Sequence, residues 1–216
     1  MNAIAGAENV TLEARAAAYL LFSRLLTSPA QRNVGLDGPA IASAVEIIAG
    51  DLPAHAWNHA ALADTFAGLD AASVVVFDRA YGAIFEVAGC ACAIREEHAG
   101  VAGKQKEEVV RFYDHFGYQP HAAVAWQPDH LAVELEFLYF LVEGERRAVN
   151  SATGTSYRLA QHDFCARHPG QWAQGLSGRA ASAGAPQSML TLLAGLETFL
   201  EADLFWHREH SPARTH

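Results

Sequence analysis

The chain has 216 residues, of which 51% are hydrophobic and 18% charged, and its formal net charge is −9. This length and composition suit one domain, or two small ones that share a core. The negative charge argues against nucleic acid as the main partner. It suits a cationic partner, although acidity also serves solubility alone.

Neither a membrane span nor an export signal is expected. No uninterrupted apolar run reaches about 18 residues, the length that a spanning helix needs. Residues 1–10 contain neither a basic region nor a long apolar run, so we predict no secretory or twin-arginine signal. The three cysteines, Cys90, Cys92 and Cys165, are an odd number, which favours a reducing compartment.

The apolar residues recur at helical spacing, and no segment alternates with the period of a strand. We therefore predict an all-α, single-domain helical bundle of roughly seven to nine helices. In chain order, the predicted helices cover residues 11–27, 38–49, 53–66 (the weakest), 73–88, 104–116, 128–143, 156–167, a short segment with Trp172 and Leu176, and 187–206.

The connections predict how the single domain, residues 1–216, is organised. An N-terminal half (11–88) and a C-terminal half (104–207) should form one core together, joined by a mobile connection at 89–103. A second mobile loop is expected at 118–127. Helical halves joined by long loops permit either a monomer or a domain-swapped dimer.

Histidines and cysteines give little indication of metal or catalytic chemistry. His55 and His59 are four residues apart, but without a third ligand we interpret them as surface histidines. His207 and His210 lie near a chain end that we expect to be mobile, so we interpret them as incidental. Cys90 and Cys92 lack a second pair. Phosphate-loop, dinucleotide and nucleophile-elbow motifs are absent from the sequence, so we predict no enzyme, catalytic residue, metal or cofactor.

The segment from residue 128 to 142 is the most apolar long helix. Pro128 suits the first helical position; alternatively, Asp129 is the N-cap. Apolar residues form two adjacent stripes, and Glu134 projects between them with His130 one turn earlier. One interpretation is structural, with these two side chains tying the helix start to a neighbouring segment. The other makes the 129–130 corner part of a binding surface. Periodicity alone does not separate them.

Residues 128–138, which begin Pro-Asp-His-Leu-Ala-Val-Glu, resemble the hallmark segment of the TorD/DmsD/NarJ family of redox-enzyme maturation chaperones. Three other segments resemble the family in the same order: residues 15–26, 81–87, and 168–172 with the final helix. Two departures, at 89–98 (no tyrosine) and 126–127 (Trp-Gln), fit a branch that serves dimethylsulfide-dehydrogenase-like or nitrate-reductase-like molybdoenzymes.

The resemblance implies a cytoplasmic, all-helical chaperone rather than an enzyme. Such proteins bind the signal peptide or N-terminal region of the catalytic subunit of a molybdenum oxidoreductase, and hold it for cofactor insertion and for assembly or export. No nucleic-acid partner, membrane insertion or cofactor is implied, and no motif supports nucleotide binding.

The resemblance and the local chemistry together give a set of candidate residues. Carboxylates beside aromatic rings suit the arginines of a twin-arginine peptide. Pro128 and Glu134 are expected to be structural at the same site. A helical metal-dependent or small-ligand-binding protein using His130 and Glu134 is the alternative. The predicted client-binding residues are Tyr19, Tyr81, Phe85, Trp126, Asp129, His130 and Glu136.

Overall fold

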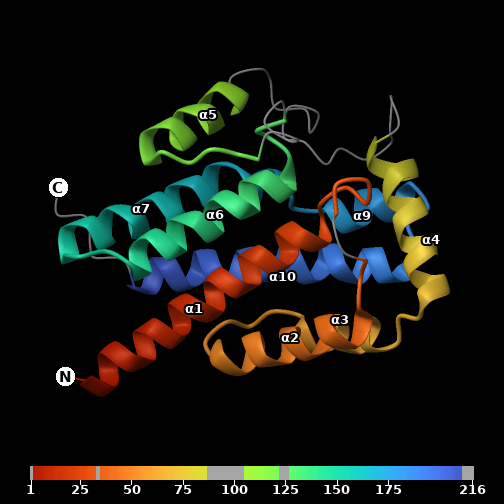
Figure 1. The fold of residues 1–216 in the computed structure, drawn as a ribbon, viewed down its shortest axis with the longest axis horizontal. Coiled ribbons are helices and arrows are strands. Elements are labelled where there is room, and N and C mark those ends of the chain that lie inside the picture. The colour runs from red at the N-terminus through yellow and green to blue at the C-terminus, as the bar shows by residue number, and fades with distance from the viewer. Residues whose placement is uncertain (1, 33–34, 87–104, 122–126, 211–216) are drawn as a thin grey trace.

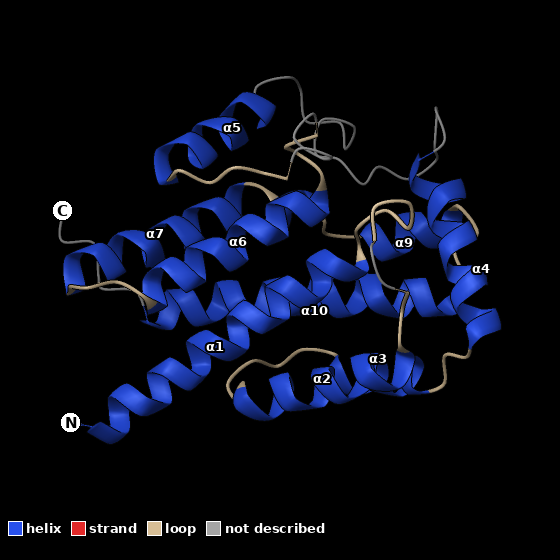
Figure 2. Cartoon of the chain, in the orientation of Figure 1, coloured by secondary structure: helices blue, strands red, loops and turns tan. Residues whose placement is uncertain are grey.

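The computed structural model describes residues 2–32, 35–86, 105–121 and 127–210. Within these ranges every regular element is a helix, as Figure 2 shows, so the all-α prediction is confirmed. The elements are α1 (Asn2–Leu25), α2 (Gly38–Asp51), α3 (His59–Ala67), α4 (Ala71–Tyr81), the π-helical turn η1 (Gly82–Glu86), α5 (Gln105–Phe116), α6 (Leu131–Arg146), α7 (Ser151–Arg167), α8 (Pro169–Trp172), α9 (Leu176–Ser182) and α10 (Gln187–His210).

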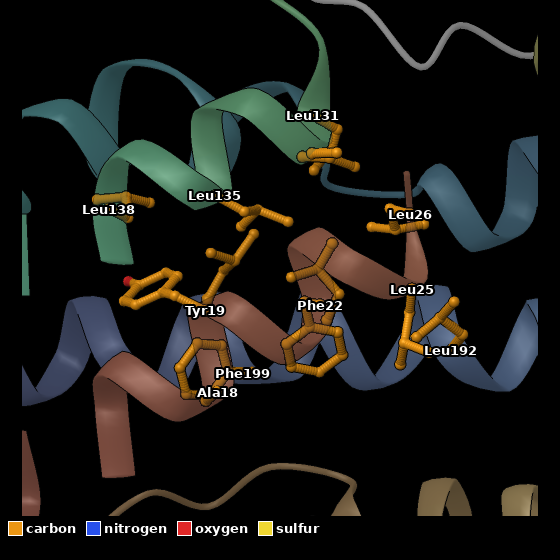
Figure 3. Packing of buried hydrophobic residues seen from close by; sticks show 14 of the residues in the cluster. Ala18, Tyr19, Phe22, Leu25, Leu26, Leu131, Leu135, Leu138, Leu192 and Phe199 are labelled. Atoms are coloured by element: carbon orange, nitrogen blue, oxygen red, sulfur yellow. The ribbon is translucent and has the colours of Figure 1, made fainter. Parts of the chain in front are cut away.

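Helix α1 lies at the centre of the bundle. It packs against α6 on one side and α2 on another, while α10 contacts α3, α7 and α9 (Figure 1). Figure 3 shows Tyr19 and Phe22 of α1 between the leucines of α6 and Phe199 of α10. These side chains are fully buried. The core therefore joins a helix from the first half of the chain to helices from the second.

Several predicted helix boundaries are wrong because a local cap or a close contact decides them. Asp70, not Ser73, caps α4, since its carboxylate accepts the Ser73 N–H at 2.8 Å. Helix α6 continues past Gly144, where the Tyr157 ring packs so closely that any side chain would collide with it. Helix α3 begins at His59, so residues 53–58 form a loop.

Other boundaries also differ from the prediction. Helix α1 begins at Asn2, well before residue 11, and α2 ends at Asp51 rather than at Ala49. Asn150 caps α7, which therefore starts before residue 156. The predicted connection at 89–103 lies outside the described residues, as do residues 122–126 of the second one, at 118–127.

A buried carboxylate connects three segments inside the core. Asp203 of α10 accepts two hydrogen bonds from Arg15 of α1, at 2.6 and 2.9 Å. The Tyr19 hydroxyl donates to it at 2.6 Å, and His55 Nε2 lies 3.1 Å away. Burial opposes the charge, but the Arg15 guanidinium and the hydrogen bonds hold the pKa of Asp203 well below its ordinary value.

His55 and His207 belong to this buried cluster, so their interpretation as surface and incidental residues is wrong. Both side chains are inaccessible to solvent. Nε2 of His207 lies 2.6 Å from an Arg15 nitrogen, and the Trp206 ring covers the guanidinium at 4.4 Å. Burial, and then the Arg15 charge, lower the pKa of His207 to about 3. A neutral His207 therefore accepts a hydrogen bond from Arg15.

Among the described residues no single helix is long and apolar enough to cross a membrane. One sharply bent pair, His59–Ala67 with Ala71–Glu86, meets the length and composition criteria jointly across a 119° bend.

The neutral state of His207 predicts acid lability. The His207 ring takes up a proton near pH 6.5 in the unfolded chain but only near pH 3 in the folded chain. The contribution of the neutral ring to the free energy of unfolding is therefore complete above pH 6.5 and is lost as the pH falls towards 3. Between these two pH values the free energy of unfolding falls by up to about 1.4 kcal/mol per pH unit. His207→Gln should therefore flatten the dependence of the unfolding free energy on pH between 7.5 and 4.5, measured by urea titration.

The exposed His210, on the same helix, provides the matched control. His210→Gln should keep the wild-type slope. An equal slope in the His207→Gln variant would contradict the assignment.

Candidate functional site

Helix α6 starts at Leu131, with His130 as its N-cap, and both predicted placements of its start are wrong. His130 is the N-cap, and its Nδ1 accepts the Ala132 N–H at 3.1 Å. Pro128 and Asp129 precede the helix and are buried. The predicted corner is therefore a structural joint on which only His130 keeps partial exposure to solvent.

Tyr81 and Phe85 meet His130 at this joint. The Tyr81 hydroxyl donates to the Leu26 carbonyl at 2.7 Å and lies 3.4 Å from His130 Nε2. The Phe85 ring packs edge-on against Tyr81, with ring centroids 5.2 Å apart. Burial, and then the Glu86 carboxylate, raise the pKa of Tyr81, so the hydroxyl keeps its proton. The joint thus connects the end of α1, the π-helical turn and the start of α6.

Glu134 lies inside the protein and has a structural partner. Trp172 of α8 donates its indole N–H to the carboxylate at 2.9 Å. His130 and Glu134 thus each tie the start of α6 to another segment, which favours the structural interpretation of these two residues. Across the described ranges, no group of three His, Cys, Asp or Glu side chains is arranged so that it could hold a metal ion.

The remaining candidate residues do not all lie together. Tyr19 is fully buried in the Asp203 cluster, away from the α6 joint, as a core tyrosine with a satisfied hydroxyl. Glu136 is half-buried and lies 4.0 Å from Arg24 of α1. Trp126 lies outside the described residues.

A pocket of about 560 Å³ opens between α1, α2 and the segment that joins them. Leu25, which precedes the Leu26 carbonyl of the joint, forms part of its wall, and Arg24 connects its edge to Glu136. The sequence analysis missed this pocket, because helical spacing marks the apolar residues but not the gap between helices. Its lining residues are Leu21, Arg24, Leu25, Thr27, Gln31, Arg32, Gly35, Leu36, Asp37, Ala40, Ile41 and Ala44.

The sequence model of the family described as "Nitrate reductase delta subunit" matches residues 56–177. This chain belongs to that family. The matched region covers more than half of the chain and includes Tyr81, Phe85 and His130 of the α6 joint, and Trp172. The resemblance to NarJ/TorD-type chaperones is therefore confirmed at the level of the family.

Two curated relatives carry informative names. The chain is 39% identical over 67 residues to the selenate reductase assembly chaperone protein of Thauera selenatis, covering 31% of this chain and 35% of that protein. It is 32% identical over 98 residues to the perchlorate reductase assembly chaperone protein of Dechloromonas aromatica (strain RCB), covering 45% and 44%. The chain thus matches less than half the length of either relative. No solved structure matches it.

The contact between Glu134 and Trp172 predicts the effect of substitutions. Glu134→Ala leaves the buried indole N–H without this acceptor and should lower the unfolding free energy by about 1–3 kcal/mol. Glu134→Gln keeps an acceptor oxygen and should cost clearly less. Urea unfolding of both variants at pH 7.5 measures the difference. An equal cost for the two variants would show that this hydrogen bond does not stabilise the fold.

Proposed function

We propose that this chain is a system-specific, cytoplasmic chaperone for the catalytic subunit of a molybdenum oxidoreductase. It binds the signal peptide or N-terminal region of that subunit and holds it for cofactor insertion and for assembly or export, without catalysing a reaction. The observation that carries the proposal is the family match over residues 56–177, which includes the start of α6 and the Tyr81 and Phe85 side chains of the joint. The names of the two relatives, both reductase assembly chaperones, support it.

The pocket between α1 and α2 suits an apolar client segment. Six of its twelve lining residues are leucine, isoleucine or alanine, the kind of surface against which an amphipathic helix buries its apolar face, and three, Arg24, Arg32 and Asp37, are charged. A second groove, of about 450 Å³ between α5 and α7, is lined by four charged side chains, Glu108, Arg111, Asp163 and Arg167. Charged side chains are four of the nine lining residues there and three of twelve in the first pocket, so burying an apolar helix in the second groove would cost more desolvation free energy, and we place the client in the first pocket.

The candidate residues then divide by how they act. Glu136 and His130 are partly exposed, so they can contact a bound segment. Tyr81 and Phe85 are buried beneath them and hold the end of α1 in place. Tyr19, on α1, holds this helix against α10 through its hydrogen bond to Asp203 in the core. Tyr81, Phe85 and Tyr19 thus contribute to binding indirectly, by positioning the pocket wall.

Asp129 and Trp126 are the two remaining candidate residues. Asp129 is buried directly before the N-cap, where its negative charge lies near the positive end of α6. We assign it a positioning role. The aromatic ring of Trp126 suits stacking against a client arginine.

Capture of the client from the native host tests the proposal. Tagged wild-type chain should retain an oxidoreductase catalytic subunit, identified by mass spectrometry. Ala44→Arg places a long charged side chain in the pocket and should reduce capture at least about tenfold, which corresponds to about 1.4 kcal/mol of binding free energy.

The matched control is Ile47→Arg, on the same helix. Ile47 is 64% exposed and does not line the pocket. This variant should capture the client as the wild type does, with both variants folded by circular dichroism. Absence of any oxidoreductase subunit from the wild-type capture would refute the proposed function. Equal capture by both variants would refute only the placement in the pocket.

A further inference from the structure

A chain of three hydrogen bonds connects the start of α6 to the wall of the pocket. The Ala132 N–H donates to His130 Nδ1 at 3.1 Å. His130 Nε2 lies 3.4 Å from the Tyr81 oxygen, and the Tyr81 hydroxyl donates to the Leu26 carbonyl at 2.7 Å. Leu26 follows Leu25, which lines the pocket. Three elements distant in sequence thus share one polar connection.

The connection requires one form of the imidazole. Nδ1 of His130 accepts a backbone N–H, so it carries no proton. The Tyr81 hydroxyl donates its hydrogen to the Leu26 carbonyl, so its oxygen can only accept in the contact with His130. Nε2 of His130 therefore carries the single ring proton and donates to Tyr81. The neutral Nε2–H tautomer satisfies all three contacts together.

Protonation of this ring has a defined consequence. An imidazolium donates from both nitrogens and accepts from neither. Nδ1–H of a protonated His130 would oppose the Ala132 N–H, and the N-cap would be lost, while the donation from Nε2 to Tyr81 could persist. Because the folded contact needs the neutral ring, its stabilising effect is present at higher pH and disappears on acidification.

The charged and titratable groups around the joint lie on several elements. The charge of Glu86, in the π-helical turn, raises the pKa of the Tyr81 hydroxyl, and the charge of Arg32 lowers it. Arg32 is ion-paired with Asp78 of α4. Asp129 is buried immediately before His130.

Two further groups lie nearby. On α6 itself, Glu134 is held by Trp172. On α5, the Tyr113 hydroxyl donates to the Pro128 carbonyl at 2.8 Å. Substitutions of His130 keep both of these hydrogen-bonding pairs, so comparing such variants reports on the effect of the His130 ring.

We propose that His130 is a pH-responsive helix cap, which ties α6 to the pocket wall while its ring is neutral and releases the helix start when the ring is protonated. The inference goes beyond the proposed function and holds for the free chain whatever its client. Its consequence is that protonation of His130 loosens the joint behind the pocket.

Nuclear magnetic resonance on the full, free chain tests the proposal. At pH 8 the ring-nitrogen shifts of His130 should identify the Nε2–H tautomer. Hydrogen-exchange protection of the Ala132 amide, corrected for the intrinsic pH dependence of exchange, should fall roughly five- to tenfold once His130 is protonated, the size expected for a lost N-cap.

The His130→Asn variant separates capping from titration, because asparagine caps helices well and does not titrate. Its Ala132 amide should stay protected over the whole pH range, whereas His130→Ala should lose protection at every pH. The Nδ1–H tautomer at pH 8 would overturn the proposal. So would wild-type protection that does not change with pH, or a pH-dependent loss of the same size in His130→Asn.

Discussion

The carboxylate of Asp203 is the constraint on which the rest of the structure depends. A charge buried this deeply is tolerated only when hydrogen-bond donors surround it, and here they come from α1 and from the loop that carries His55. Arg15 and Tyr19 thereby fix α1 against α10. With α1 held in place, its last turn can serve both as the anchor of the α6 joint and as a wall of the pocket.

The sequence predicts the fold well where burial follows periodicity. The leucine stripe of α6 is fully buried as expected, and so is Glu134, because apolar neighbours surround its position in the pattern. The partners of buried polar groups are not predictable in this way. His55 and His207 meet Asp203 and Arg15 across separations of 148 and 192 residues, and no local pattern encodes such contacts.

The candidate site was predicted only in part. The structure places Tyr81 beside both His130 and Phe85 at the start of α6, while their role in binding a client stays a prediction. Motif resemblance could not separate side chains that face a ligand from those that hold the wall behind it, because both kinds belong to the same motif. Tyr19 illustrates the difference: its hydroxyl is directed to Asp203 inside the core. The pocket itself depends on the packing of α1 against α2, which no motif describes.

A double-mutant cycle on Arg15 and Asp203, measured by urea unfolding, tests this account most directly. Arg15→Met or Asp203→Leu alone leaves one buried charge unpaired and should cost about 3–5 kcal/mol. The double variant removes both charges, so we expect it to be no less stable than the less stable single variant. If the two costs add to within about 0.5 kcal/mol, the residues act independently, and the buried ion pair does not organise the fold.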